Sequence, residues 1–561
     1  MGGGQAPLDV PQGTTLVIEV AGQYVEADSP TLLGRLLGDS GKPFVSLLSL
    51  FALAERDDRI ETVVIYIRDI GIGWGKSSEL RGAIARLRDA GRKTIAVLEL
   101  GSFSANRPYY IATAAEEIYA VPGSVVPVLG LSAEYFYLGD MWEKIGVGLE
   151  ANRVGKYKSA VEVYTGTGMS DESREMSDAL LDSAESRFVS AIAEGRGLST
   201  DQVKAIIDEG VVGGKDLIAR GLIDDFAHMS DLDALAGNTL RGNVYRNVDP
   251  RSVGFDPKVK LALIYGTGAV VTGKADRSTS GGPVFAAQRI RRALLEAAAN
   301  PEIEGIVLRL DSPGGSPLAS EIIWDTIKTV RDDGMTVVVS VSDVAASGAY
   351  YVASIADAIV ISPGALTGSI GVFSIRPNFE GLMEKLGINS ESLTRGRHAD
   401  FYSSSQPLSD SAKARMQTIV DDIYDLFIAR VASGRDLEVA QVDTLGQGRV
   451  WSAEQALEVG LVDELGGLHE AIGWILREKD LDEDTDVVLV SYPAPLSLAS
   501  EITKLLQSGV LPSAASPIDA AVDAIFDAPG MPDAVAPLRS WLFDLQPGSP
   551  WLVSPVFVEI H

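Results

Sequence analysis

Residues 340–363 read S-V-S-D-V-A-A-S-G-A-Y-Y-V-A-S-I-A-D-A-I-V-I-S-P, where the end of a strand runs into an apolar helix. The β-branched residues 336–341 predict a buried strand, and Ser347 follows it among alanines and Gly348. A hydroxyl in the first turn of a helix lies near free backbone N–H groups that favour a developing anion. The stretch therefore indicates either a serine nucleophile or only an N-cap and turn.

Two flanking loops favour the nucleophile. Residues 306–316, I-V-L-R-L-D-S-P-G-G-S, predict a buried strand that runs into a Gly-Gly turn. Gly314 and Gly315 have no Cβ, so their N–H groups can approach a substrate carbonyl closely. Downstream, T-G-S-I-G at residues 367–371 gives a second loop of small residues, with a hydroxyl at Ser369. Together these segments predict an enzyme with an oxyanion hole.

The motifs D-S-P-G-G, A-A-S-G-A-Y-Y and T-G-S-I-G, in this order and spacing, resemble the signal peptide peptidase A family of serine proteases. The resemblance covers roughly residues 14–480 and implies a ClpP/crotonase-like fold, in the long form with two tandem domains. It also implies that cleaved signal peptides are digested by a homotetramer at the periplasmic side of the bacterial inner membrane. Relatives of this length carry an N-terminal membrane anchor, but residues 1–5 have neither a basic nor an apolar segment of a signal.

The sequence contains an internal duplication. Tyr-Tyr at 350–351 repeats Tyr-Tyr at 109–110 with an offset of 350 − 109 = 241, and G-L-V-D at 460–463 repeats G-L-I-D at 221–224 with an offset of 460 − 221 = 239. Strands alternate with helices in both halves, which predicts the α/β class. We expect domains at residues 14–240 and 256–480, followed by a C-terminal extension at 481–561.

The duplication separates two chemical groups between the halves. The position equivalent to Ser347 is 347 − 241 = 106, which is Asn106, so the first half lacks the nucleophile. Lys158 maps to 158 + 241 = 399, which is Ala399, and the second half has no lysine between Lys385 and Lys413. One half keeps a hydroxyl and the other an amine, as expected for a split Ser-Lys dyad.

A lysine can act as a general base when burial favours its neutral form, by ~3–5 pKa units for a fully buried amine. The alternative interpretation is that Lys158 is a solvent-exposed lysine on a loop, which is where most lysines are found. The resemblance, matched at Y-K-S-A (157–160), implies that Lys158 is the base and ranks Lys156 well below it. Ser369 is a candidate to orient the amine. The candidate oxyanion donors are the backbone N–H groups of Gly314, Gly315 and Gly348.

Composition excludes several other functions. The net charge is −29 with no basic cluster, which argues against binding of nucleic acid. The chain has no cysteine, which excludes disulfides and a cysteine nucleophile. It has only four histidines, and His398 is the one plausibly placed for catalysis, so a Ser-His-Asp triad is not favoured. No apolar run reaches the ~18–20 residues of a membrane span. No metal or nucleotide cofactor is expected.

Two rival functions stay open. An acyl-CoA enzyme of the crotonase type would also use glycine N–H donors, but with acidic residues as acid and base. A catalytically inactive scaffold would need neither Ser347 nor Lys158, and both are present. Labelling by a serine-reactive phosphonate distinguishes the Ser-Lys peptidase from both.

Overall fold

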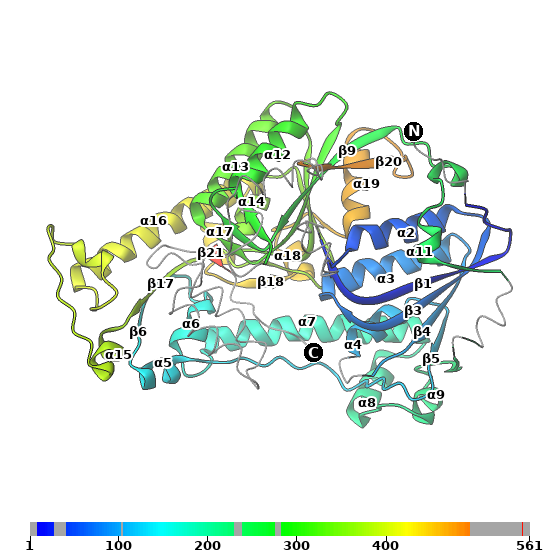
Figure 1. The fold of residues 1–561 in the computed structure, drawn as a ribbon, viewed down its shortest axis with the longest axis horizontal. Coiled ribbons are helices and arrows are strands. Elements are labelled where there is room, and N and C mark those ends of the chain that lie inside the picture. Colours follow the sequence, from blue (N-terminus) through cyan, green and yellow to red (C-terminus); the bar gives the residue numbers. More distant parts are fainter. Residues whose placement is uncertain are drawn as a thin grey trace.

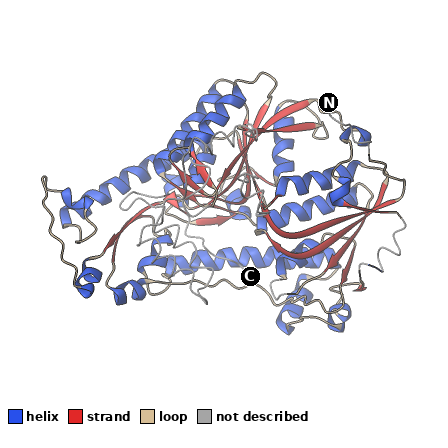
Figure 2. Ribbon diagram, in the orientation of Figure 1, coloured by secondary structure: helices blue, strands red, loops and turns tan. Residues whose placement is uncertain are grey.

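The computed structural model describes residues 8–26, 41–101, 105–228, 230, 238–274, 282–493 and 552–553. Each half of the chain builds its own sheet with helices packed on it (Figures 1 and 2). Strands of the first sheet follow the order β2-β1-β3-β4-β5-β7, with β8 beside β1, and all these pairs are parallel. Strands of the second sheet follow the order β18-β16-β14-β12-β9-β20, with β15 beside β14 and β19 beside β15.

The elements of the first half are β1 (Thr14–Val25), β2 (Lys42–Pro43), α2 (Phe44–Arg56), β3 (Ile60–Gly71), α3 (Trp74–Asp89), β4 (Lys93–Leu98), α4 (Asn106–Ala112), β5 (Glu117–Ala120), α5 (Gly139–Ile145), β6 (Gly148–Val154), α6 (Ala160–Thr165), α7 (Asp171–Arg196), α8 (Thr200–Glu209), α9 (Lys215–Ala219), β7 (Asp225–Phe226), β8 (Thr239–Arg241) and α11 (Gly242–Tyr245).

The second half contains β9 (Val259–Thr267), β10 (Ala269–Val271), β11 (Val284–Ala286), α12 (Ala287–Ala298), β12 (Gly305–Ser312), β13 (Gly314–Gly315), α13 (Pro317–Asp332), β14 (Val337–Ala346), α14 (Gly348–Ala353), β15 (Ala358–Ile361), β16 (Leu366–Gly368), β17 (Val372–Asn378), α15 (Glu380–Leu386), α16 (Asp410–Arg435), α17 (Val439–Leu445), β18 (Val450–Ser452), α18 (Ala453–Glu458), β19 (Glu464–Leu465), α19 (Leu468–Glu478) and β20 (Val487–Tyr492), and β21 (Leu552–Val553) comes later in the chain.

The central strands are apolar on both faces because helices cover both sides of a parallel sheet. In β12 the segment Gly305–Ser312 is buried at every position except Asp311, which is half-buried. Figure 1 shows α2 and α3 on one side of β1 and β3, and α7 on the other. Burial on both faces explains why these strands read as continuous apolar runs in the sequence.

The two halves repeat the same contacts. Helices α7 and α16 are both 26 residues long, and each begins after a serine whose side chain accepts a backbone N–H. At their far ends Arg196 pairs with Asp224 and Arg435 pairs with Asp463, at 2.9 and 2.6 Å. The Tyr109 hydroxyl donates to the Leu222 carbonyl, as the Tyr350 hydroxyl does to that of Leu461. The predicted α/β fold with an internal duplication is confirmed.

The second sheet continues past residue 480, where the sequence predicted its domain to end. Strand β20 adds to the sheet beside β9 in parallel register, with Val487 opposite Val259. This strand is short and half-buried along most of its length, with no alternation of buried and exposed residues, which made it hard to recognise in the sequence. Residues 494–551 and 554–561 of the predicted extension lie outside the described residues.

The halves are joined by an antiparallel ladder between β6 of the first and β17 of the second, which lie side by side in Figure 1. Its first rung pairs Val154 with Val372. Helix α7 also bridges the halves, because it contacts α4 at one end and β18 at the other. The loops that follow β6 and precede β17 are therefore held next to one another.

The repeated ion pairs predict equal effects of matched substitutions. In Asp463→Ala the partners Arg435 and the Ile359 N–H lose a charged acceptor, and in Asp224→Ala the same happens to Arg196 and the Ile118 N–H. We expect each variant to lose about 1–3 kcal/mol of unfolding free energy in urea titrations.

The control is Glu458→Ala on the exposed face of α18, which should stay within about 0.5 kcal/mol of the parent. A large loss in one aspartate variant with none in the other would contradict the structural equivalence of the two halves.

Candidate active site

The amine of Lys158 meets the hydroxyl of Ser347 across the boundary between the halves. Nζ lies 2.8 Å from Ser347 Oγ, and both side chains are fully buried. The same Nζ lies 2.9 Å from both the carbonyl oxygen and the Oγ of Ser369. Three of the residues singled out in the sequence thus surround one nitrogen.

Ser347 occupies a strained backbone conformation between a strand and a helix. β14 ends at Ala346 and α14 begins at Gly348, while Ser347 itself has φ 55° and ψ −116°. A side chain rarely adopts positive φ, so the fold must hold this residue in place. Its N–H donates to the Gly368 carbonyl, and its own carbonyl accepts from the Tyr351 N–H. The hydroxyl is presented on a sharp strand-to-helix turn, a setting that would suit a serine nucleophile.

The loop that carries Lys158 is docked on the second half by its backbone. The Tyr157 N–H donates to the Gln447 carbonyl, and the Lys158 N–H donates to the Gly155 carbonyl. Gly448, at φ 79°, approaches this loop so closely that a Cβ would lie 2.5 Å from the Lys158 nitrogen and 2.7 Å from its Cα. The stem of the lysine also passes Gly371, where a Cβ would lie 3.1 Å from Cδ.

Burial alone lowers the pKa of Lys158 well below its ordinary value. The amine contacts three oxygens, and none of them belongs to a carboxylate. A neutral amine has two N–H groups and one lone pair. The N–H groups can donate to the two Ser369 oxygens, which leaves the lone pair for the Ser347 hydroxyl proton. The arrangement can therefore remove that proton.

The Gly-Gly turn lies in a small sheet of its own. Strand β13 pairs in parallel with β10, where Val270 is opposite Gly315. On its other edge β13 pairs antiparallel with β21, where Leu552 is opposite Gly315 and Val553 opposite Gly314. The Gly314 N–H donates to Ser312 Oγ at 3.3 Å. Strand β13 thus offers an edge on which an extended segment can pair.

Gly348 and Gly315 are placed differently from Gly314. The N–H of Gly348 belongs to the first turn of α14, where backbone donors have no partner within the helix. Gly315 has φ 157° and is packed so tightly against Val270 that a Cβ would overlap the Val270 carbonyl. The close packing explains the glycine at position 315.

His398 does not take part in this contact. It lies at the start of a short 3₁₀ turn, Ala399–Tyr402, and its ring packs edge-on against Phe401. Lys156, the competing lysine, places its amine over the Tyr157 ring at 4.8 Å. Within the described part of the chain, Lys158 is the cationic side chain in hydrogen-bond contact with Ser347.

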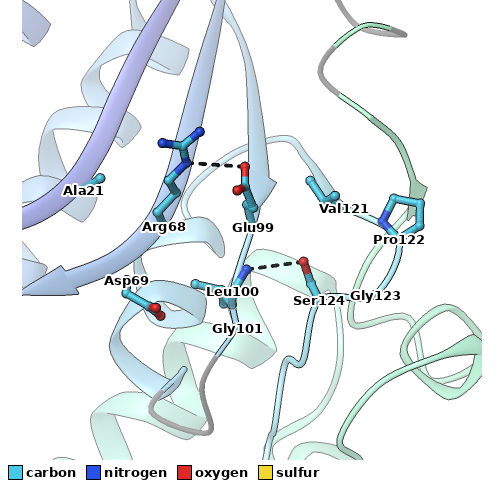
Figure 3. A pocket seen from close by; sticks show the side chains of 10 residues that line it. All are labelled: Ala21, Arg68, Asp69, Glu99, Leu100, Gly101, Val121, Pro122, Gly123 and Ser124. Atoms are coloured by element: carbon cyan, nitrogen blue, oxygen red, sulfur yellow. Dashed lines mark hydrogen bonds and ion pairs between the residues drawn. The ribbon is translucent and has the colours of Figure 1, made fainter.

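A pocket in the first half has no such machinery (Figure 3). It opens near the ends of β3, β4 and β5, and Arg68 pairs there with Glu99 at 3.3 Å. Ser124, which lines it, donates to the Leu98 carbonyl and accepts from the Leu100 N–H. A serine occupied by backbone partners in this way is structural.

Sequence reasoning missed the residues that shape the site without contacting the nucleophile. The positive φ of Ser347 and Ser369 left no pattern, because serine is not a typical residue for that conformation. Gly448 lies in Q-G-R and reads as an ordinary loop glycine. Its role depends on a loop 290 residues away, 448 − 158 = 290, and a single sequence carries no signal for that contact.

Comparison with known proteins gives one family for most of the chain. The model of peptidase family S49 matches residues 86–239 and 329–482, one segment in each half, and the Clp protease model matches residues 283–360. Among relatives, the chloroplastic serine protease SPPA of Arabidopsis thaliana is 30% identical over 90% of this chain and 74% of its own length. Protease 4 of Haemophilus influenzae is 32% identical over 77% and 72%, and that of Salmonella typhi 30% over 91% and 86%.

The contact between Gly448 and the lysine loop predicts that Gly448→Ala lowers activity, since the methyl group must displace the Lys158 backbone. A shift of about 1 Å costs up to ~10²-fold in rate, so we expect at least a tenfold fall in kcat for a peptide substrate.

Gly460→Ala is the matched control. Gly460 has φ 76°, close to the 79° of Gly448, but its Cβ would meet nothing within 4 Å. Both variants bear the same backbone strain, so equal losses of kcat in the two would show that contact with the lysine loop has no importance.

Proposed function

Because the chain belongs to peptidase family S49 and is a serine protease, we propose that it is a Ser-Lys endopeptidase with Ser347 as nucleophile and Lys158 as general base. Its substrates are cleaved signal peptides and other extended hydrophobic peptides. The observation that carries the proposal is the 2.8 Å contact between a buried amine without a carboxylate partner and a hydroxyl on a strained turn.

The reaction follows from this contact. Lys158 accepts the hydroxyl proton while Ser347 Oγ bonds to the substrate carbonyl carbon. The N–H groups of Gly315 and Gly348 stabilise the oxyanion, since the Gly314 N–H is engaged by Ser312. The peptide C–N bond then breaks, and the lysine returns its proton to the leaving amine. Water, deprotonated by the same lysine, attacks the acyl carbon and releases the serine with its proton.

Ser369 orients the base. Its backbone N–H donates to the Arg449 carbonyl at 2.6 Å, which holds the residue at φ 53°. Two of its oxygens face Nζ and direct the lone pair of the amine toward Ser347. This supports an orienting role in which Ser369 does not exchange protons with substrate.

The edge of β13 that β21 occupies supports an extended peptide as substrate. An added strand gains main-chain hydrogen bonds that do not depend on its side chains, which suits the digestion of varied sequences. The chain's own segment Leu552–Val553 pairs there, antiparallel to Gly314–Gly315. A folded protein cannot offer such a strand, so unfolded peptides are preferred.

The two rival functions fit the site less well. An acyl-CoA enzyme of the crotonase type would need acidic groups beside the oxyanion donors, whereas the nucleophile here faces an amine. An inactive scaffold has no reason to bury an uncompensated amine, which costs several kcal/mol of stability when charged.

Assembly and location belong to the same proposal. We place the enzyme in the bacterial envelope, on the periplasmic side of the inner membrane, as a homotetramer that shelters the active sites. Of the helices in the described residues, none is both long and apolar enough to cross a bilayer.

Substitution of either dyad member tests the mechanism. We expect Ser347→Ala and Lys158→Met to reduce kcat for a peptide by at least ~10³-fold each, because groups that act as a unit fail together. Lys158→Arg should fail as well, since a guanidinium stays protonated. In the parent, kcat/KM should rise with pH as the amine deprotonates, with a midpoint below the ordinary lysine value of about 10.4, because burial lowers the pKa of Lys158.

His398→Ala is the control and should retain the parental rate and pH profile. Loss of activity in His398→Ala together with substantial turnover in Lys158→Met would reverse the assignment of the base.

The pairing of β21 predicts that the chain's own segment competes with substrate. Proline at both Leu552 and Val553 removes the N–H donors needed for the ladder. We expect kcat/KM for an extended peptide to rise roughly tenfold, the equivalent of about 1.4 kcal/mol of lost competition.

A small activated ester, too short to pair with β13, should be hydrolysed at the parental rate. If the peptide kcat/KM is unchanged by the double substitution, the edge of β13 is not the peptide-binding strand.

A further inference from the structure

The glycine-rich segment of the first half, I-G-I-G-W-G-K at residues 70–76, has lost the Gly-Gly turn of its counterpart but makes close contact with the catalytic half. It leads from β3 into α3, and α3 packs against β14, the strand that ends just before Ser347. The segment therefore lies against the second half at the nucleophile strand.

Lys76 links the two strands that lead into the active site. Its Nζ lies 2.6 Å from Asp311 on β12 and 2.5 Å from Asp343 on β14, and only 3% of the residue is exposed. Asp343 also accepts the Lys76 backbone N–H at 3.0 Å. Asp311 precedes Gly314 by three residues, and Asp343 precedes Ser347 by four. One amine thus pairs with a carboxylate on the strand that precedes the Gly-Gly turn and with another on the strand that precedes Ser347.

The contact falls on an irregularity in the sheet. Between β12 and β14 the register shifts, since Leu310 is opposite Val341 but Ser312 is opposite Ala345. Strand β14 therefore has two more residues than β12 over this interval, and Asp343 lies in the middle of them. Bulges of this kind bend a strand and redirect the side chains that follow. Ser347 comes two residues after Ala345, where this bulge ends, so its direction is among those that the bulge can set.

The first half reaches the bulge through glycines. A Cβ on Gly73 would overlap the Asp343 carboxylate, and one on Gly75 would overlap the Ser342 carbonyl. Neither glycine has a positive φ, so their small size rather than their backbone freedom is what the contact needs. The segment that corresponds to the Gly-Gly turn therefore packs directly against the bulge of β14.

The positive charge of Lys76 balances the negative charges of the carboxylates around it. Glu26 lies 3.3 Å from the Lys76 amine, so three carboxylates face it. Arg309 neutralises Glu26 and also Glu79 of α3, at 3.1 and 2.6 Å. Burial disfavours a charged Lys76, but the carboxylates outweigh this effect and hold the pKa of Lys76 well above its ordinary value.

The two aspartates also depend on this lysine. Burial and the neighbouring carboxylates raise the pKa of Asp311. Without the lysine, Asp311 and Asp343 would repel each other.

We propose that Lys76 is a positioning residue for the proteolytic reaction: by pairing with Asp311 and Asp343 it holds the bulge of β14, and so keeps the Ser347 hydroxyl in line with Lys158 and the oxyanion loop. It does not touch substrate and exchanges no proton with it. The inference rests on the proposed function of Ser347 but concerns a different lysine, which lies in the first turn of α3.

The test is Lys76→Met in the full-length chain, which keeps the length of the side chain and removes its charge. Two rates are measured from pH 6 to 9: kcat for a peptide, and labelling of Ser347 by a small fluorophosphonate. We expect both to fall about ten- to a hundredfold with KM nearly unchanged, as a displaced reacting atom predicts. The deficit should grow with pH, because burial and neighbouring carboxylates raise the pKa of Asp311, and its ionised form then repels Asp343.

Rescue separates positioning from simple loss of structure. In Lys76→Met/Asp343→Asn the repulsion is gone and an oxygen still accepts the residue-76 N–H, so labelling should recover at least several-fold and the pH-dependent deficit should disappear. Lys93→Met, at the exposed start of β4, is the matched control and should behave as the parent.

If Lys76→Met does not fold, Asp343→Asn alone takes its place, and it should slow labelling in the same direction by a smaller factor. Parental labelling in Asp343→Asn, a pH-independent deficit in Lys76→Met, or no recovery in the double variant would each overturn the positioning role. A dead Lys158→Met with an unaffected Lys76→Met would leave the Ser-Lys mechanism standing and remove this inference alone.

Discussion

The structure depends on keeping an uncompensated amine in a dry site next to a hydroxyl. Burial lowers the pKa of Lys158, as its proposed role of base requires, and it also destabilises the fold whenever the amine is charged. Three oxygens around Nζ offset part of this cost. Because the amine and the hydroxyl come from different halves of the chain, everything that fixes one half against the other also fixes the chemistry.

The β6–β17 ladder does most of this fixing, and its position explains why. Its first rung joins Val154 and Val372. Lys158 comes four residues after the first of these, and Ser369 three residues before the second. A ladder has a defined register, so the lysine is delivered to Ser369 at a set depth. Gly448 then closes the lysine loop from the other side, where a side chain would not fit.

The sequence predicted the fold class and the duplication, and it singled out the candidate site residues, because each leaves a local or periodic signal. Tandem motifs at a nearly constant offset showed the duplication, and the complementary loss at Asn106 and Ala399 indicated that Ser347 and Lys158 act together. The sequence could not show the positive φ of Ser347, the β14 bulge, or the contacts of Lys76. The contacts of Lys76 join segments more than 200 residues apart. The bulge and the positive φ depend on how β14 pairs with β12 and how Ser347 bonds to Gly368, which no local pattern shows. Strand β20 was missed for a related reason, since its half-buried pattern becomes a strand only beside β9.

Duplication followed by loss explains why the halves cannot be separated. The first half gave up the nucleophile position to Asn106, whose amide now donates to the Gly130 carbonyl as an ordinary structural contact. In its glycine-rich segment, glycines 73 and 75 allow a close approach to β14 of the other half. The second half has no lysine at the matching position, so in the proposed mechanism Lys158 is its base. In that mechanism each half lacks a group that the other supplies, and neither would act alone.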